Sequence, residues 1–202
     1  MSVPANEVKL AELTLATKVT IARILGIPVF ILLMIYYFIS LEKGVPNDNL
    51  RYVAFGFFVA IIATDALDGY LARSRNEVST LGALLDPLAD KMLVLSSLVL
   101  LTRPGFGELD PQLPVWFSVT LISRDAFLIV GYFVIHAVAN HVDVKPSVAG
   151  KGSTFLVAIT VGCVLMQVPD PVLNVFIVLS ALCVIVSWWQ YLQSGLKQMH
   201  YQ

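Results

Sequence analysis

Six apolar segments, separated by short polar stretches, make up most of the chain. They cover residues 24–41, about 51–73, 80–102, about 113–139, about 153–168 and about 172–192. A transmembrane helix needs about 20 predominantly apolar residues, with a range of about 17–25. The pattern therefore predicts an all-α, polytopic membrane protein with six transmembrane helices.

A shorter element is predicted at the N-terminus. Residues 1–18 interleave charged and apolar side chains at helical spacing: Glu7, Lys9, Glu12 and Lys18 among Val8, Leu10, Leu13 and Leu15. This spacing predicts a short amphipathic helix that lies on the membrane surface. A frayed terminus is the alternative. The mixed charges are not those of a signal peptide.

The composition strengthens the membrane interpretation. Hydrophobic residues make up 57% of the 202 positions and charged residues only 13%, and the mean hydropathy is +0.80. We interpret residues 1–202 as a single membrane domain. The formal net charge of −1 gives no indication of a nucleic-acid partner. Cys163 and Cys183 lie in separate apolar segments, which favours packing roles over a disulfide or a metal site.

Basic residues in the connecting segments predict the orientation in the membrane. Cytoplasmic connections carry an excess of lysine and arginine. With the N-terminus inside, the inner segments contain Lys9, Lys18, Arg23, Arg73, Arg75, Lys145, Lys151 and Lys197, and the outer loops contain Lys43, Arg51 and Arg103. The bias therefore predicts that both termini lie on the cytoplasmic side.

Four carboxylates interrupt the second and third apolar segments. Asp65 and Asp68 are three residues apart, and Asp86 and Asp90 are four apart, so each pair shares one face of a helix. The polar linker 74–80 is short enough to fold the two helices back as antiparallel neighbours. We therefore expect all four acids near one end of a helix pair, on the cytoplasmic side.

Divalent cations would explain why four acids gather in a membrane. Without a partner, their negative charges would repel, and each ionised acid in hydrocarbon costs about 2.5–3.5 kcal/mol on insertion scales. Carboxylate oxygens suit Mg²⁺ or Mn²⁺, and four of them could hold two ions that clamp a phosphate. Gly69 and Gly82 leave room beside the backbone, and Arg73 is a natural phosphate partner. An acidic helix pair that serves only packing is the alternative.

The full spacing resembles a known family signature. The motif Asp65-x2-Asp68-Gly69-x2-Ala72-Arg73-x8-Gly82-x3-Asp86-x3-Asp90 is similar, at every fixed position, to that of the CDP-alcohol phosphatidyltransferases. The resemblance implies transfer of a phosphatidyl group from CDP-diacylglycerol to an alcohol, with release of CMP, in the membrane. It also implies a homodimer.

The resemblance implies a role for each motif residue. Asp65, Asp68, Asp86 and Asp90 would hold two Mg²⁺ or Mn²⁺ ions per active site, and Asp90 would also be the catalytic base. The cytidine diphosphate portion would be contacted by Asp68, Gly69, Arg73, Gly82 and, outside the fixed positions, Ser79.

The segment Thr17-x2-Thr20-x2-Arg23 is similar to the family's N-terminal segment, whose polar residues lie near the nucleotide. For Arg23, the alternative is an interfacial anchor that reaches the lipid headgroups.

Two later cations are further candidates. Arg124 lies beside Asp125 within the fourth apolar segment, where it could contact the phosphate of the lipid or acceptor, or could form a purely structural pair. Lys151 opens the fifth segment on the inner side, where it could contact the same phosphates or simply follow the positive-inside bias.

The acceptor alcohol is the harder question. Residues 81–91, 122–125 and 146–151 look like the eukaryotic-type cardiolipin synthases of this family, whose acceptor is phosphatidylglycerol. The alternative is a phosphatidylglycerophosphate synthase, which uses glycerol 3-phosphate. That branch usually has Glu at the position of Asp125 and a second Arg at the position of Tyr132. From another class, a divalent-cation transporter would also need intramembrane acids, but such sites favour repeats and interrupted helices.

Overall fold

A computed structural model describes residues 15–75, 80–102, 111–139 and 148–200. Within these ranges the side chains of residues 15–19, 65–75, 80–88, 90, 132–139, 148–149, 151, 192 and 194–200 are not described. The described residues form six helices and no strand, which confirms the all-α class. The helices are α1 (Leu15–Glu42), α2 (Asp48–Arg75), α3 (Thr80–Thr102), α4 (Val115–Ala139), α5 (Val148–Leu165) and α6 (Asp170–His200).

The predicted third helix, 80–102, has the same bounds as α3, whereas other predicted ends differ. α1 begins at Leu15 instead of 24, and α6 continues to His200 instead of 192. Polar residues precede the apolar stretch of α1 and follow that of α6, and in both cases they are part of the helix. The predicted surface helix lies largely in residues 1–14, outside those the structure describes, and its last residues belong to α1.

Helix ends are fixed by residues in the left-handed backbone region. α1 is followed by Gly44 with φ 67°, and the Val45 amide donates to the Ser40 carbonyl at 3.2 Å. α5 is followed by Gln167 with φ 50°, and the Val168 amide donates to the Cys163 carbonyl at 2.9 Å. Both are Schellman-type ends, which satisfy carbonyls that the helix leaves free. The second explains why α5 ends at Leu165 and not at the predicted 168.

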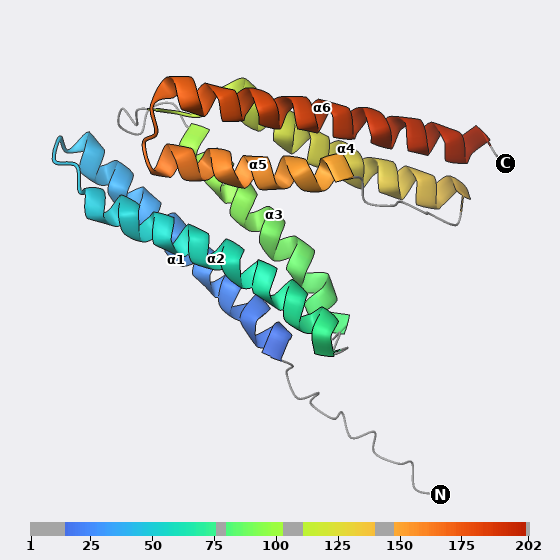
Figure 1. Cartoon of the computed structure of the whole chain (residues 1–202), viewed down its shortest axis with the longest axis horizontal. Helices are drawn as coiled ribbons and strands as arrows, with labels where there is room; N and C mark the ends of the chain where they lie inside the picture. Colours follow the sequence, from blue (N-terminus) through green and yellow to red (C-terminus); the bar gives the residue numbers. More distant parts are fainter. Residues whose placement is uncertain (1–14, 76–79, 103–110, 140–147, 201–202) are drawn as a thin grey trace, which may run out of the picture.

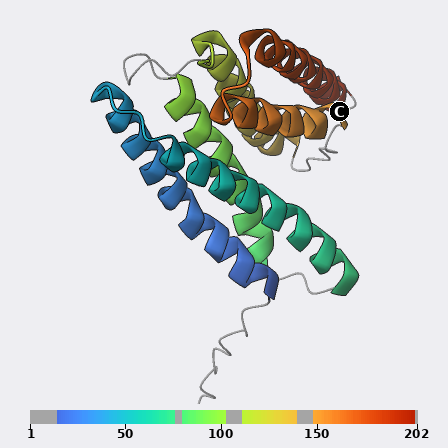
Figure 2. The ribbon, with the colours of Figure 1, turned by 60° about the vertical axis from the view of Figure 1, so that its left-hand side comes forward.

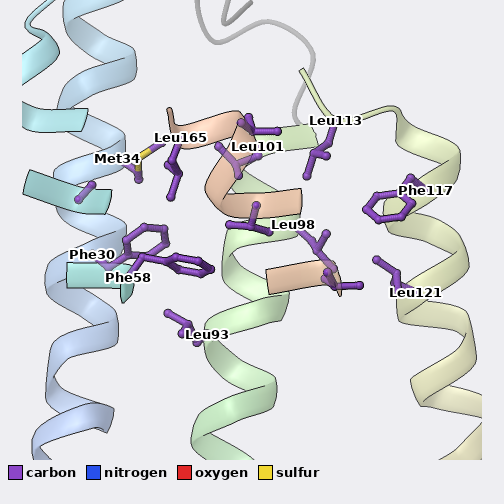
Figure 3. Close-up of a cluster of buried hydrophobic side chains, with 14 of the residues drawn as sticks. Phe30, Met34, Phe58, Leu93, Leu98, Leu101, Leu113, Phe117, Leu121 and Leu165 are labelled. Carbon is purple, nitrogen blue, oxygen red and sulfur yellow. The ribbon is translucent and has the colours of Figure 1, made fainter. Parts of the chain in front are cut away.

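The helices form two groups that meet at α3 (Figures 1 and 2). α1 packs against both α2 and α3, and α6 packs against both α4 and α5. α3 also contacts α4 and α5, and α2 contacts α5. Figure 3 shows the resulting core, in which Phe30 and Phe58 approach Leu93 while Leu98 and Leu101 lie between Leu165 and Phe117.

Two of the helices are long and apolar enough in their described residues to cross a membrane, Thr20–Glu42 and Asp170–Tyr191. Lys91–Thr102 and Gly152–Leu165 are shorter apolar stretches. Outward-facing side chains such as Leu25, Val99 and Trp116 are also apolar, which is typical of helices in contact with lipid. The described residues confirm six helices. That all six cross the membrane stays a prediction.

Arg51 is not in a loop, as the sequence suggested, but inside α2 and almost fully buried. Its Nη1 donates to the Leu165 carbonyl at 3.0 Å, at the end of α5. The guanidinium also lies 4.7 Å from the centre of the Tyr52 ring and forms a 3.4 Å ion pair with Asp48. Asp48 lies in the first turn of α2, where a negative charge stabilises a helix. The helix accordingly begins at residue 48, before the predicted start at 51. Arg51 therefore joins α2 to α5 at the end of the bundle away from the four acids.

Candidate active site

The four predicted acids lie on adjoining ends of two helices. Asp65 and Asp68 are near the end of α2, and Asp86 and Asp90 are near the start of α3. Only residues 76–79 separate the helices, and a chain of that length spans no more than about 18 Å. Both views show the end of α2 and the start of α3 at the same end of the molecule (Figures 1 and 2). The four side chains themselves are outside what the structure describes.

Buried stripes of described residues run along both helices towards these positions. On α2 the buried residues Ala54, Phe58 and Ile61 recur at steps of three and four, and the next two steps lead to positions 65 and 68. On α3, Leu93 and Ser97 are buried, and two turns before them lie positions 86 and 90. The predicted sharing of a face within each pair stays a prediction, because these four side chains are not described.

α1 brings two polar residues to the same end of the bundle. Thr20 and Arg23 begin its inward stripe and are only 1% and 2% exposed. Such burial disfavours the interfacial-anchor interpretation of Arg23, because a snorkelling head group keeps contact with water or lipid headgroups. A buried cation needs compensating charge, and α1 packs against both acid-bearing helices. A contact of Arg23 with a nucleotide stays a prediction, and the side chain of Thr17 is not described.

Arg124 belongs to a chain of polar contacts that crosses three helices. Its Nη1 donates to Asp125 Oδ1 at 2.9 Å, and its Nη2 donates to Ser187 Oγ on α6 at 3.0 Å. The other oxygen of Asp125 accepts from Lys91 Nζ on α3, also at 2.9 Å. The pair of Arg124 and Asp125 that was considered as the structural alternative is therefore present. A phosphate contact of Arg124 stays a prediction.

Lys91 was missed by the sequence interpretation. It is the residue after Asp90 and the only lysine or arginine in α3. A cation within an apolar segment is costly unless it is paired, and that signal could have marked it. Its partner Asp125 is far away in the sequence, so the contact itself could not be foreseen.

The other predicted site residues are placed only by their helices. Gly69 and Arg73 lie on the last turns of α2, Gly82 lies in the first turn of α3, and Lys151 lies near the start of α5. Ser79 lies outside the described residues. Among the side chains that the structure describes, no group of three or more His, Cys, Asp or Glu residues forms a metal site.

The chain was compared with known families and proteins. Residues 13–190 match the model of the family described as CDP-alcohol phosphatidyltransferase. The CDP-diacylglycerol–glycerol-3-phosphate 3-phosphatidyltransferase of Bacillus subtilis is 33% identical over 187 residues, covering 88% of this chain and 92% of that protein. A protein of the same name from Aquifex aeolicus is 31% identical over 172 residues, covering 82% and 89%. The cardiolipin synthase (CMP-forming) of Streptomyces coelicolor is 35% identical over 149 residues, covering 71% and 60%.

These matches agree with the motif and with the fold. The matched region contains the whole motif from Asp65 to Asp90, together with Arg124 and Lys151. Together with the two apolar spans, the family indicates a membrane protein. The chain is an enzyme that belongs to the CDP-alcohol phosphatidyltransferase family.

Proposed function

We propose that this enzyme transfers the phosphatidyl group of CDP-diacylglycerol to phosphatidylglycerol, forming cardiolipin and CMP. The choice of acceptor rests on the net charge of three contacting side chains on α3 and α4. Lys91 and Arg124 contribute two positive charges and Asp125 one negative charge, which leaves one net positive charge. Tyr132 stands where the glycerol 3-phosphate enzymes usually have a second Arg.

One net positive charge matches the acceptor phosphodiester of phosphatidylglycerol. A phosphodiester carries one negative charge, whereas a phosphomonoester such as glycerol 3-phosphate carries about −1.5 to −2 at pH 7. Desolvating the second charge without a partner is costly. We assign Arg124 and Lys151 to the acceptor or lipid phosphate, and either cation alone could balance the single charge of a phosphodiester. The acyl chains would lie along the apolar outer faces of the helices.

The transfer itself is one displacement at phosphorus. The acceptor hydroxyl attacks the phosphatidyl phosphorus, the bond to the CMP oxygen breaks, and CMP leaves with the bonding electrons. Asp90 takes the proton of the attacking hydroxyl. Asp68, Gly69, Arg73, Ser79 and Gly82 hold the cytidine diphosphate portion.

The donor set fits a pair of hard divalent cations. Asp65 and Asp68 near the end of α2, and Asp86 and Asp90 near the start of α3, would supply four carboxylates, whose oxygens prefer Mg²⁺ or Mn²⁺. Two such ions, when bound, would neutralise the diphosphate and the leaving CMP.

The names of two relatives favour a second candidate, phosphatidylglycerophosphate synthase. The similar proteins of Bacillus subtilis and Aquifex aeolicus are named for glycerol 3-phosphate as acceptor, whereas the similar protein of Streptomyces coelicolor is named a cardiolipin synthase. The acceptor therefore has to be measured.

The deciding experiment offers the purified protein CDP-diacylglycerol and Mg²⁺ or Mn²⁺ with one acceptor at a time, and measures CMP. Phosphatidylglycerol, glycerol 3-phosphate, inositol phosphate and serine are compared. We expect phosphatidylglycerol to support release far better than glycerol 3-phosphate. The reverse preference would replace cardiolipin synthesis with the phosphatidylglycerophosphate reaction.

We also propose that the acid-bearing end faces the cytoplasm and that the enzyme is a homodimer. The orientation rests on the basic residues of the connections, and the inner excess remains when the buried Arg23 of the inner side and the buried Arg51 of the outer side are both left out. The dimer rests on analogy with the family. Accessibility of engineered cysteines at 43 and at 75 to a membrane-impermeant reagent tests the orientation.

A further inference from the structure

Lys91 and Asp125 form an ion pair between α3 and α4 beside the predicted base. Lys91 Nζ lies 2.9 Å from Asp125 Oδ2, and Asp125 Oδ1 accepts from Arg124 at 2.9 Å. Arg124 in turn donates to Ser187, which is fully buried on α6. A continuous line of polar contacts thus runs from the residue after Asp90, across α4, to α6.

Packing alone does not explain this line. Its members lie in helices whose other described residues are largely apolar, where ionised groups are costly. The Lys91 and Asp125 side chains are 49% and 38% exposed, and an ion pair at that exposure adds little to stability. Its directional contact between two helices can instead favour one arrangement of them over others.

The ion pair is one of two polar contacts between α3 and α4 among the described side chains. The other is the hydrogen bond between the Thr102 and Ser118 hydroxyls, at the far end of α3. Lys91 and Thr102 are 11 positions apart, or about 16 Å along a helix. Packing against α1, α4 and α5 sets the overall rotation of α3, and the ion pair adds a directional contact directly beside Asp90. Asp90 precedes Lys91 by one residue, about 100° around the axis, so its position follows that rotation.

We propose that Lys91 and Asp125 are positioning residues for the base Asp90. This inference rests on the proposed role of Asp90 in the transfer. The Lys91–Asp125 pair holds the first turns of α3 in the rotation that places Asp90 at the acceptor hydroxyl. Arg124 and Ser187 hold Asp125 in turn. Because a misplacement of about 1 Å can cost about 100-fold in rate, loss of the pair should act on turnover.

The test is a double-mutant cycle on Lys91→Met and Asp125→Asn. Each substitution removes a charge and keeps the approximate size of the side chain. We expect each single variant to lower kcat with saturating acceptor by about 10-fold or more, and to change KM for CDP-diacylglycerol less than about threefold. Because both act through one contact, the double variant should lie within about threefold of the slower single variant. Lys91→Arg, which keeps the charge, should retain at least about a third of kcat.

Lys43→Met and Asp48→Asn are the matched controls. They make the same chemical changes at exposed positions near the other end of α1 and α2, and should leave kcat within about twofold of the wild type. Thermal unfolding in detergent and the dissociation constant for CMP confirm that each variant is folded and binds nucleotide. If Lys91→Met does not fold, Lys91→Gln takes its place in the cycle.

Three results would overturn the inference: a kcat of Lys91→Met equal to that of Lys43→Met, losses that multiply in the double variant, or a rise in acceptor KM with unchanged kcat. The last would make Lys91 a substrate contact. Failure of the proposed function is a separate outcome, since the wild-type protein would then release no CMP with phosphatidylglycerol.

Discussion

Replacing Arg51 by Met should destabilise the protein without changing its chemistry. The guanidinium is 3% exposed and joins α2 to the last carbonyl of α5, Leu165, at 3.0 Å. Met fills similar space with an apolar chain, so little cavity is left. The variant therefore isolates the polar contacts of Arg51 from its packing.

The magnitude follows from the contacts that are lost. A hydrogen bond from a charged donor contributes about 1.5–3 kcal/mol, and the cation–π contact with Tyr52 about 0.5–1 kcal/mol. The pair with Asp48 adds little, since Asp48 is 55% exposed. Arg51 Nε is buried without a hydrogen-bond partner in the described structure, so its removal offsets part of the loss. We expect a net cost of about 2–3 kcal/mol.

The assay is thermal unfolding of the purified protein in detergent, with CMP release measured on the folded fraction. A change of 1 kcal/mol shifts Tm by about 2–4 °C for a chain of this size, so Tm should fall by roughly 4–12 °C. Lys43→Met, an exposed cation nearby, should leave Tm unchanged. An unchanged Tm for Arg51→Met would refute a stabilising role for the contact between Arg51 and Leu165. A lower kcat with unchanged Tm would mean that Arg51 acts on the site.

Three predictions concern the site itself. Asp90→Asn should abolish turnover while CDP-diacylglycerol still binds, because Asn keeps the shape but accepts no proton; CMP release above a tenth of the wild-type rate would exclude Asp90 as the base. EDTA should stop the reaction and Mg²⁺ or Mn²⁺ should restore it, because four neighbouring carboxylates repel without cations; full activity after exhaustive chelation would refute the two-metal site. Tyr132→Arg should improve binding of glycerol 3-phosphate by roughly 10- to 150-fold, the worth of a charge-assisted contact of about 1.5–3 kcal/mol; Tyr132→Phe is the control, and equal affinities of the two variants would contradict the charge argument.

The sequence predicted helices best where the apolar stretch has sharp limits. α3 was predicted with both ends correct, because Arg103 and Pro104 follow it directly and a polar linker precedes it. The start of α1 was missed because Thr20 and Arg23 are polar, whereas in the fold they lie on its buried stripe. Local polarity predicts an end only when the polar residue faces solvent.

The site shows a similar division between local and distant information. The spacing of the four acids is local, and the helices that carry them, α2 and α3, are consecutive and joined at the acid-bearing ends. The contacts of Lys91 with Asp125 and of Arg51 with Leu165 join distant parts of the chain. No periodicity of either helix encodes such a partner, so these contacts needed the fold. The ligand roles of the acids rest on the motif and stay predictions.

The placement of the polar contacts suggests how the bundle tolerates its acids. Four neighbouring carboxylates at one end of α2 and α3 would repel one another without a counter-charge. The opposing restraints lie along the helices: α1 packs against both, Arg51 ties α2 to α5, and the Thr102–Ser118 and Lys91–Asp125 contacts tie α3 to α4. Residues 76–79 join the two helices at the acidic end. α2 is thus held near its start and α3 along its length by neighbouring helices, and these contacts oppose a repulsion between the acid-bearing ends.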